Sequence, residues 1–207
     1  MSRAGGEADR RRLHQAVYAL RQTLRDAGAS YRHIVCANGC YQLDPAVPIW
    51  IDVDELDRLM AEARRLEAEG HTGRAFETYR EAERLYRGNF LEDFPLAEWA
   101  TAERSRLLSA YVELANRLAD LHAERGDHAS AIGICNRVLA RDSWNEESAR
   151  RKMRSYASSG NPSLALRAFK SCQDELAREL GTAPSPETRA LYEEILSGAR
   201  SARNEMV

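Results

Sequence analysis

Apolar residues recur at helical spacing through most of the chain. In residues 9–26 they stand three or four positions apart, which predicts a helix with one buried stripe. Gly28 is expected to end this helix. The stripe consists of Leu13, Val17, Leu20 and Leu24. Next, Asn38-Gly39 separates two β-prone runs, which predicts a hairpin with a tight type I′ turn. The chain therefore opens with a helix and a β-hairpin.

From Asp52 onward the pattern is helical to the end of the chain. Asp52 and Glu55 have capping-box spacing, and the helix that they begin stops at Gly70. Further helices are predicted at about 72–87, 97–125, 128–141, 145–158, 161–180 and 186–199. The breaks between them fall at glycines and at the stretch from Pro184 to Pro186.

These helices repeat with the tetratricopeptide period of 34 residues, which separates Gly126 from Gly160. An earlier copy begins at Gly70. An alanine stands five residues after each glycine, and a larger side chain stands four residues after that alanine. Another large side chain stands four residues before each glycine. These positions are Ala75, Ala131, Ala165; Tyr79, Cys135, Phe169; and Leu66, His122, Tyr156. Since no helix pair covers its own apolar face, the pairs must stack. The predicted fold is mainly α, a tetratricopeptide-like helical repeat.

An insertion interrupts this repeat. Residues 85–107, LYRGNFLEDFPLAEWATAERSRL, end one helix and begin another, with no helical period between them. They place Phe90, Phe94 and Trp99 in the connection. We expect these aromatic side chains to be mostly buried and to fasten the insertion across the repeats, without forming a ligand site.

The charge of the chain is uneven along its length. Its 207 residues carry a net charge of -2, yet residues 1–33 hold seven arginines against three acidic residues, a net of +4. The rest of the chain therefore carries -6. A basic end on an acidic body fits contact with a polyanion, and a solvated charged helix is the alternative. Without a secretory leader or a membrane span, we expect a cytoplasmic protein with free thiols.

Signals of catalysis are absent from the sequence. The five histidines form no HExxH motif, and neither a Gly-rich phosphate loop nor GxSxG occurs, so we expect no enzyme and no cofactor. His122 stands at a packing position of the repeat. Cys36 and Cys40 flank the hairpin turn, but the second ligand pair of a zinc site is missing. We expect no metal; redox or adventitious metal chemistry is the alternative.

The first helix and the hairpin have the order of the C-terminal half of a winged helix. In that fold the helix enters the major groove, and the hairpin, or wing, lies along the backbone or the minor groove. The helix presents arginine and glutamine side chains, which are the types that read guanine and adenine edges. Many surface helices have the same pattern, so the order alone does not assign DNA binding.

Three segments of this chain resemble, in their order, the bacterial transcriptional activator domain of the antibiotic-regulatory-protein family. They are IDVDELDRLMAEA from Ile51, the insertion of residues 85–107, and ELARELGTAPSPETRALYEEIL from Glu175. The resemblance covers about residues 49–197 and implies tetratricopeptide-like pairs between the segments. It also implies a transcription regulator whose repeat domain mediates self-association, as a possible homodimer, and contacts RNA polymerase or an effector protein.

In that family a winged helix of the OmpR type precedes the activator domain. RRRLHQAVYALRQTL is similar to its recognition helix, and IVCANGCYQLDP to its wing. The match implies a partial winged helix at 1–48, the activator domain at 49–197 and a tail at 198–207. The residues implied to contact DNA are Arg10, Arg11, Arg12, His14, Gln15, Tyr18, Arg21 and Arg25.

A full winged helix would have a sheet and two helices ahead of the recognition helix, which begins here about eight residues after Met1. The chain is then expected to be a fragment, or a regulator that lacks most of its DNA-binding domain. In either case we expect weak DNA binding. The apolar stripe of the first helix would then have to pack on the hairpin, on the repeat domain or on another copy of the chain.

A second function competes with regulation: a stand-alone scaffold that binds a protein or peptide in the groove of the repeats and does not contact DNA. The concave positions expected to line that groove are Arg64, Asn116, Asp120, Arg150 and Arg154. Their mixed charge favours a polar partner. The target promoter, the effector and the sense of regulation stay open.

Overall fold

The chain divides into two units, Met1–Ile51 and Asp52–Val207, in the computed structural model. The structure describes residues 3–29 and 33–204, and the surroundings of side chains at 7–29 and 33–199. Helices dominate the described residues, which confirms the predicted fold class.

Unit 1 contains a helix and a two-stranded sheet. Helix α1 (Arg3–Asp26) begins earlier than predicted, and strands β1 (Ile34–Ala37) and β2 (Cys40–Leu43) pair antiparallel. Asn38 and Gly39 both have positive φ, at 52° and 77°, as a type I′ turn requires. The predicted hairpin is confirmed.

The hairpin covers only part of the apolar stripe of α1. Val17 and Ile34 are buried, whereas Leu13 and Leu20 remain 53% and 50% exposed. Two strands of four residues are too short to cover the whole face of a helix of 24 residues.

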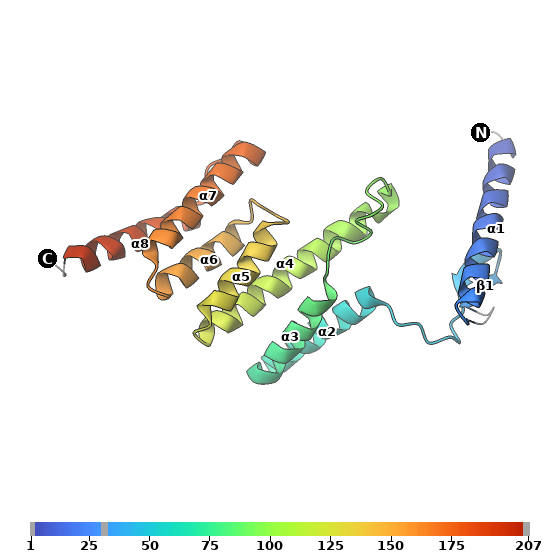
Figure 1. Cartoon of the computed structure of the whole chain (residues 1–207), viewed down its shortest axis with the longest axis horizontal. Coiled ribbons are helices and arrows are strands. Elements are labelled where there is room, and N and C mark those ends of the chain that lie inside the picture. Colours follow the sequence, from blue (N-terminus) through green and yellow to red (C-terminus); the bar gives the residue numbers. More distant parts are fainter. Residues whose placement is uncertain (1–2, 30–32, 205–207) are drawn as a thin grey trace. The chain divides into compact units, whose positions relative to one another are not determined.

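Unit 2 is a series of helices in which successive members lie side by side (Figure 1). They are α2 (Asp52–Ala68), α3 (Thr72–Leu85), the short 3₁₀ helix η2 (Glu98–Ala100), α4 (Thr101–Glu124), α5 (His128–Leu139), α6 (Glu146–Ser158), α7 (Pro162–Leu180) and α8 (Pro186–Asn204). Helix α8 continues beyond its predicted end at 199, into the expected tail; residues 205–207 lie outside the described residues. The described helices are not long and apolar enough to cross a membrane.

The repeat pattern places its residues where the sequence predicts. Gly70, Gly126 and Gly160 all have positive φ, between 76° and 79°, a conformation that costs glycine little as it turns the chain between helices. Ala75, Ala131 and Ala165 are at most 1% exposed, and Tyr79, Cys135 and Phe169 are buried beside them. One detail differs: at the start of α2, Glu55 pairs with Arg58 instead of closing a capping box with Asp52.

The insertion between α3 and α4 is not held by buried aromatic side chains, so that expectation is wrong. Phe90 is half-buried against the core, but Phe94 and Trp99 are 64% and 76% exposed. The guanidinium of Arg104 holds the backbone of the insertion, through hydrogen bonds to carbonyl oxygens that include those of Phe90 and Phe94. The insertion is therefore held through its main chain, by a cation, and not through these two aromatic side chains.

Candidate protein-binding groove and basic helix

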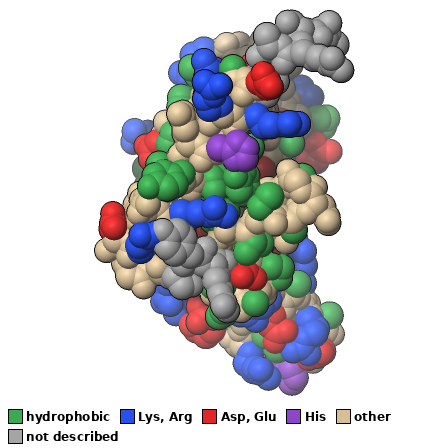
Figure 2. Space-filling model, turned by 90° about the vertical axis from the view of Figure 1, so that its right-hand side faces the viewer, with side chains coloured by type: hydrophobic (Ala, Val, Ile, Leu, Met, Phe, Trp, Pro, Cys, Tyr) green, Lys and Arg blue, Asp and Glu red, His purple; other side chains and the backbone are tan. Residues whose placement is uncertain are grey.

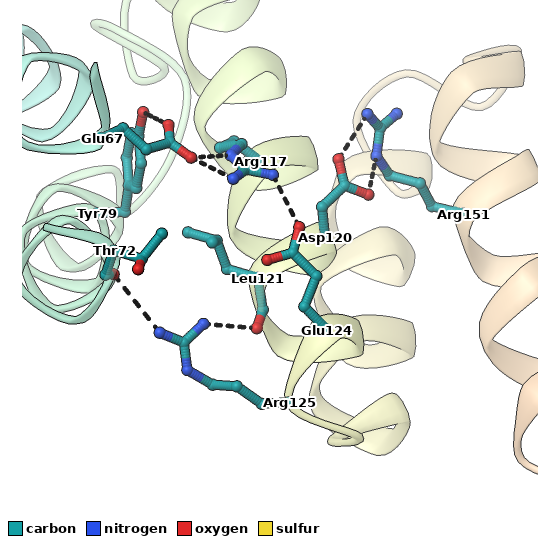
Figure 3. A network of polar contacts seen from close by, with 9 residues as sticks. All are labelled: Glu67, Thr72, Tyr79, Arg117, Asp120, Leu121, Glu124, Arg125 and Arg151. Carbon is teal, nitrogen blue, oxygen red and sulfur yellow. Dashed lines mark hydrogen bonds and ion pairs between the residues drawn. The ribbon is translucent and has the colours of Figure 1, made fainter. Parts of the chain in front are cut away.

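A groove of about 620 Å³ lies across α2, α4 and α6. Its charged lining residues are Arg64, Glu67, Glu113, Arg117, Asp120, Asp142, Glu147 and Arg151. Three arginines stand against five carboxylates, so the lining carries a net charge of -2. Ion pairs link these groups across the helices: Arg117 with Glu67 and Arg151 with Asp120, as Figure 3 shows, and also Arg64 with Glu113.

Arg117 of α4 and Glu67 of α2 form the first of these links. The guanidinium of Arg117 pairs with the carboxylate of Glu67 and reaches Glu124 at 3.2 Å. The hydroxyl of Tyr79 donates to the second oxygen of Glu67 at 3.0 Å. These two donors, Arg117 first, lower the pKa of Glu67. Burial, and then the hydrogen bond to Glu67, raise the pKa of Tyr79 to about 12.

Helices α4 and α6 are linked by two further contacts. Arg151 donates from Nε and Nη2 to the two oxygens of Asp120, at 2.8 and 2.9 Å, and also pairs with Glu147. The hydroxyl of Ser148 donates to Oδ1 of Asn116 at 2.7 Å, and both of these residues are buried. The groove is therefore a polar surface whose shape is fixed by contacts between helices.

The carboxylate of Asp142 differs from the others, because one of its oxygens lacks a hydrogen-bond partner among the described residues. Oδ2 of Asp142 accepts from Nδ2 of Asn145 at 2.9 Å, whereas its Oδ1 is buried without a hydrogen-bond partner among the described residues.

The five residues expected to line a groove do not all meet in one place. Arg64, Asn116 and Asp120 line the large groove. Arg150 does not: it donates to Oγ1 of Thr188 at 2.9 Å and ties α6 to α8. Arg154 lines a separate cavity of about 90 Å³, which Asp120 also borders.

The sequence reasoning missed two arginines that dominate this network. Arg117 and Arg151 are 34 residues apart, one repeat period, so they occupy equivalent positions on α4 and α6. Each follows directly after a position that the sequence analysis selected, Asn116 and Arg150. The selected Asn116 lines the groove beside Arg117, whereas at the equivalent position on α6 the groove residue is Arg151 and not Arg150.

The basic helix α1 presents most of its candidate DNA-contacting side chains to solvent. Arg10, Arg11, Arg12, Gln15 and Tyr18 are exposed. A shallow hollow of about 550 Å³ lies on this face, lined by Glu7, Arg10, Arg11, His14, Gln15 and Tyr18. Over the face that Figure 2 draws, arginine and lysine side chains are scattered among hydrophobic and acidic ones.

Two of the candidate residues contact the hairpin instead. His14 Nδ1 and the hydroxyl of Tyr41 share a hydrogen bond of 2.6 Å. Arg21 donates to the carbonyl oxygen of Ile34 at 2.8 Å, and its guanidinium lies 5.6 Å from the centre of the Tyr41 ring. His14 and Arg21 therefore fix the hairpin on α1.

The four cysteines are free, with Cys36 and Cys40 exposed and Cys135 and Cys172 buried. Within the described ranges, 3–29 and 33–204, no three His, Cys, Asp or Glu side chains are grouped so as to hold a metal ion. His122 packs against Phe76 and pairs with Asp127, which is the packing position predicted for it.

Comparison with known proteins identifies relatives over most of the chain. The bacterial transcriptional activator domain matches residues 51–196. The transcriptional regulatory protein MoaR1 of Mycobacterium tuberculosis is 27% identical over 188 residues, 90% of this chain and 60% of that protein. The regulatory protein DnrI of Streptomyces peucetius is 29% identical over 158 residues, 76% of this chain and 58% of that protein. The chain thus spans about 60% of the length of these relatives.

Solved structures agree with the fold. Mycobacterium tuberculosis EmbR, solved in complex with a low-affinity phosphopeptide, has a TM-score of 0.70 and 26% identity, and covers 91% of this chain and 50% of its own. The tetratricopeptide domain of a Plasmodium falciparum FK506-binding protein has a TM-score of 0.53 and 16% identity, covering 75% of this chain and 97% of its own. The latter shows the fold alone and confirms the predicted tetratricopeptide-like architecture.

Proposed function

Because this chain belongs to the bacterial transcriptional activator domain family, we propose that it acts in transcription regulation, with unit 1 contacting DNA and unit 2 binding a protein partner. The observation that carries the proposal is the extent of the match. The 188 residues aligned with MoaR1 exceed the length of unit 2, which is 156 residues, so the likeness to a regulator extends into unit 1.

The exposed face of α1 supplies the proposed DNA contacts. At about 100° of rotation per residue, Arg11, Gln15 and Tyr18 fall within one sector of the helix, with Arg25 beside them. Arginine and glutamine make paired hydrogen bonds with guanine and adenine edges, and arginines also neutralise phosphates. His14 and Arg21 act differently in this proposal, because they set the angle between helix and hairpin.

A binding experiment on the full chain tests the DNA contacts. DNA fragments are selected from a random duplex pool, and their affinity is compared with that of an unselected duplex at two salt concentrations. We expect a weak preference for selected DNA, which Arg11→Ala/Gln15→Ala should remove together with part of the salt dependence. Arg167→Ala, at an exposed arginine of α7, is the matched control. Equal affinity of wild type and double variant for selected DNA would contradict the assignment.

The groove supplies the proposed protein contact. Its polar lining fits a hydrophilic surface of RNA polymerase, an effector protein or a second copy of the chain. A phosphorylated segment is disfavoured, since the net charge of -2 would repel it. The phosphopeptide in the structure of EmbR is therefore not carried over to this groove.

Purified RNA polymerase is the first partner to test. Glu113 and Glu147 are 60% and 58% exposed at the groove, so Glu113→Lys and Glu147→Lys each change its net charge from -2 to 0 with little loss of packing. We expect each to weaken polymerase binding about tenfold, whereas Glu193→Lys, at an exposed glutamate of α8, does not. Groove-dependent binding of a protein by a chain that binds no DNA would favour the scaffold function instead.

A further inference from the structure

Three large apolar side chains stand exposed on the insertion of unit 2. Phe94, Leu96 and Trp99, here called the aromatic tip, are 64%, 92% and 76% exposed. They lie within six residues of one another, at the amino-terminal end of α4 (Figure 1). Exposed groups of large apolar side chains mark interaction sites more often than chance surface positions.

The backbone beneath the aromatic tip is firmly held. Arg104 donates to the carbonyl oxygens of Phe90, Leu91, Phe94 and Pro95, at distances from 2.5 to 3.2 Å. Main-chain hydrogen bonds from Phe94 to Leu91 and from Ala97 to Phe94 add successive turns. Since the main chain is already ordered, a partner that covers the tip has less conformational entropy to overcome.

The surroundings of the aromatic tip are acidic. Residues 88–103 contain Glu92, Asp93, Glu98 and Glu103 and no lysine, arginine or histidine, a net charge of -4. The first three are exposed, while Glu103 pairs with Arg106. Arg104 is directed into the segment but is bound to its carbonyl oxygens, and Arg106 is held by Glu103 and Asp57. Exposed carboxylates, here called the acidic rim, thus stand beside the exposed apolar residues in the sequence.

We propose that the aromatic tip docks on an apolar surface of a second protein that is flanked by lysine or arginine side chains. Large aromatic side chains, tryptophan above all, contribute most of the binding energy at many protein interfaces. The acidic rim selects a cationic partner and speeds its approach. An anionic lipid surface does not fit, because these carboxylates would be repelled from it. The proposal concerns residues other than those of the groove and of α1.

Tryptophan fluorescence of the full chain provides the test. The chain contains three tryptophans, Trp50, Trp99 and Trp144, so Trp50→Phe/Trp144→Phe leaves Trp99 as the only one. The probe is a synthetic amphipathic helix of leucine and lysine, and the comparison peptide has glutamate in place of lysine. We expect saturable binding of the lysine peptide with a shift of Trp99 emission to shorter wavelength. The glutamate peptide should bind about tenfold more weakly or worse, and salt should weaken the lysine complex.

Matched variants of that chain locate the contact. Phe94→Ser/Leu96→Ser should weaken binding of the lysine peptide about tenfold or more. Leu164→Ser/Leu180→Ser removes two other exposed leucines, from α7, and should leave binding unchanged. Circular dichroism confirms that each variant is folded.

Four outcomes would overturn the proposal. The first two are no binding of the lysine peptide and equal affinity for both peptides. The third is an equal loss of peptide affinity in Phe94→Ser/Leu96→Ser and Leu164→Ser/Leu180→Ser. The fourth is burial of Trp99 by something other than the peptide. In the absence of peptide, a shift of Trp99 emission that depends on protein concentration would mean that a second copy of the chain covers the tip. A shift on adding neutral phosphatidylcholine vesicles would mean that a membrane surface covers it.

Discussion

Arg151 binds both carboxylate oxygens of Asp120, with Nε and Nη2 at 2.8 and 2.9 Å, and thereby ties α6 to α4 within the groove. The two side chains are 18% and 34% exposed. Arg64 and Glu113 form a second pair in the same groove, between α2 and α4, but these side chains are 52% and 60% exposed. The same chemical groups thus meet at two levels of solvent screening, and their contributions to stability should differ.

The first prediction compares these two pairs. Asp120→Asn leaves the half-buried guanidinium of Arg151 with Glu147 alone and should lower the free energy of unfolding by about 1–3 kcal/mol. Glu113→Gln breaks the exposed pair and should cost less than about 1 kcal/mol. Urea denaturation of both variants and the wild type measures the difference. Equal losses would mean that burial does not decide the strength of these pairs.

The second prediction concerns the order of the insertion. Arg104→Ala removes a charged donor from four carbonyl oxygens and should cost about 1–3 kcal/mol. Trp99→Ala should cost less than about 1 kcal/mol, because the indole is 76% exposed and little of it is removed from water on folding. The reverse ranking in urea denaturation would show that the indole is buried in solution.

The third prediction is a loss of stability in acid through Glu67. Hydrogen bonds from Arg117 and then Tyr79 lower its pKa below the ordinary value of 4.5 in the folded chain. The unfolded chain therefore binds a proton first as the pH falls, and the stabilisation present above about pH 4.5 is lost below it. Glu67→Gln lacks this group, so its deficit in unfolding free energy should be largest at neutral pH and shrink on acidification. A deficit that stays constant from pH 7 to pH 3 would contradict the assignment.

The fourth prediction applies the same linkage at alkaline pH. Burial raises the pKa of Tyr79 to about 12, from 10. Between these values the unfolded chain releases the phenolic proton and the folded chain keeps it, so stability should fall as the pH rises through this window. Tyr79→Phe keeps the ring in the core without an ionisable group. Its unfolding free energy should decline less than that of the wild type, in guanidinium titrations at pH 9 and pH 11.

The sequence was sufficient for the fold wherever short-range rules decide it. Gly126 and Gly160 mark turns because positive φ is costly for other residues, and Ala131 and Ala165 are buried because only a small side chain fits between close helices. Asn38-Gly39 specifies its turn for a similar reason. These outcomes depend on neighbours within a few residues, or on a fixed period.

The candidate sites depend on contacts that the sequence does not encode locally. Arg104 and Phe94 differ by only ten positions, yet no periodic pattern indicates that a guanidinium would bind the carbonyl oxygens of the insertion. Whether Trp99 is buried follows from that backbone path and not from the hydrophobicity of its side chain. Likewise, Arg21 binds the carbonyl oxygen of Ile34 because the hairpin folds back on α1, whereas helical spacing alone suggests an outward position.

The fifth prediction concerns the thiols. Cys135 and Cys172 are buried, and burial raises the pKa of each to about 11, so at neutral pH neither supplies the reactive thiolate. Cys36 and Cys40 are exposed on the hairpin. Ellman's reagent should therefore titrate two of the four thiols rapidly in the folded chain and all four in denaturant. Cys36→Ser/Cys40→Ser should remove the rapid phase.

The register of the hairpin adds a sharper test with the same thiols. Cys36 lies opposite Tyr41, and Cys40 lies opposite Ala37. Successive residues of a strand point to opposite faces, so the two sulfur atoms lie on different sides of the sheet and cannot form a disulfide without unpairing the strands. Mild oxidation of the full chain should thus link separate chains and leave each hairpin unbridged, as non-reducing electrophoresis and mass spectrometry would show. A monomeric product that has lost both rapid thiols to an internal bridge would mean that the strands pair in another register.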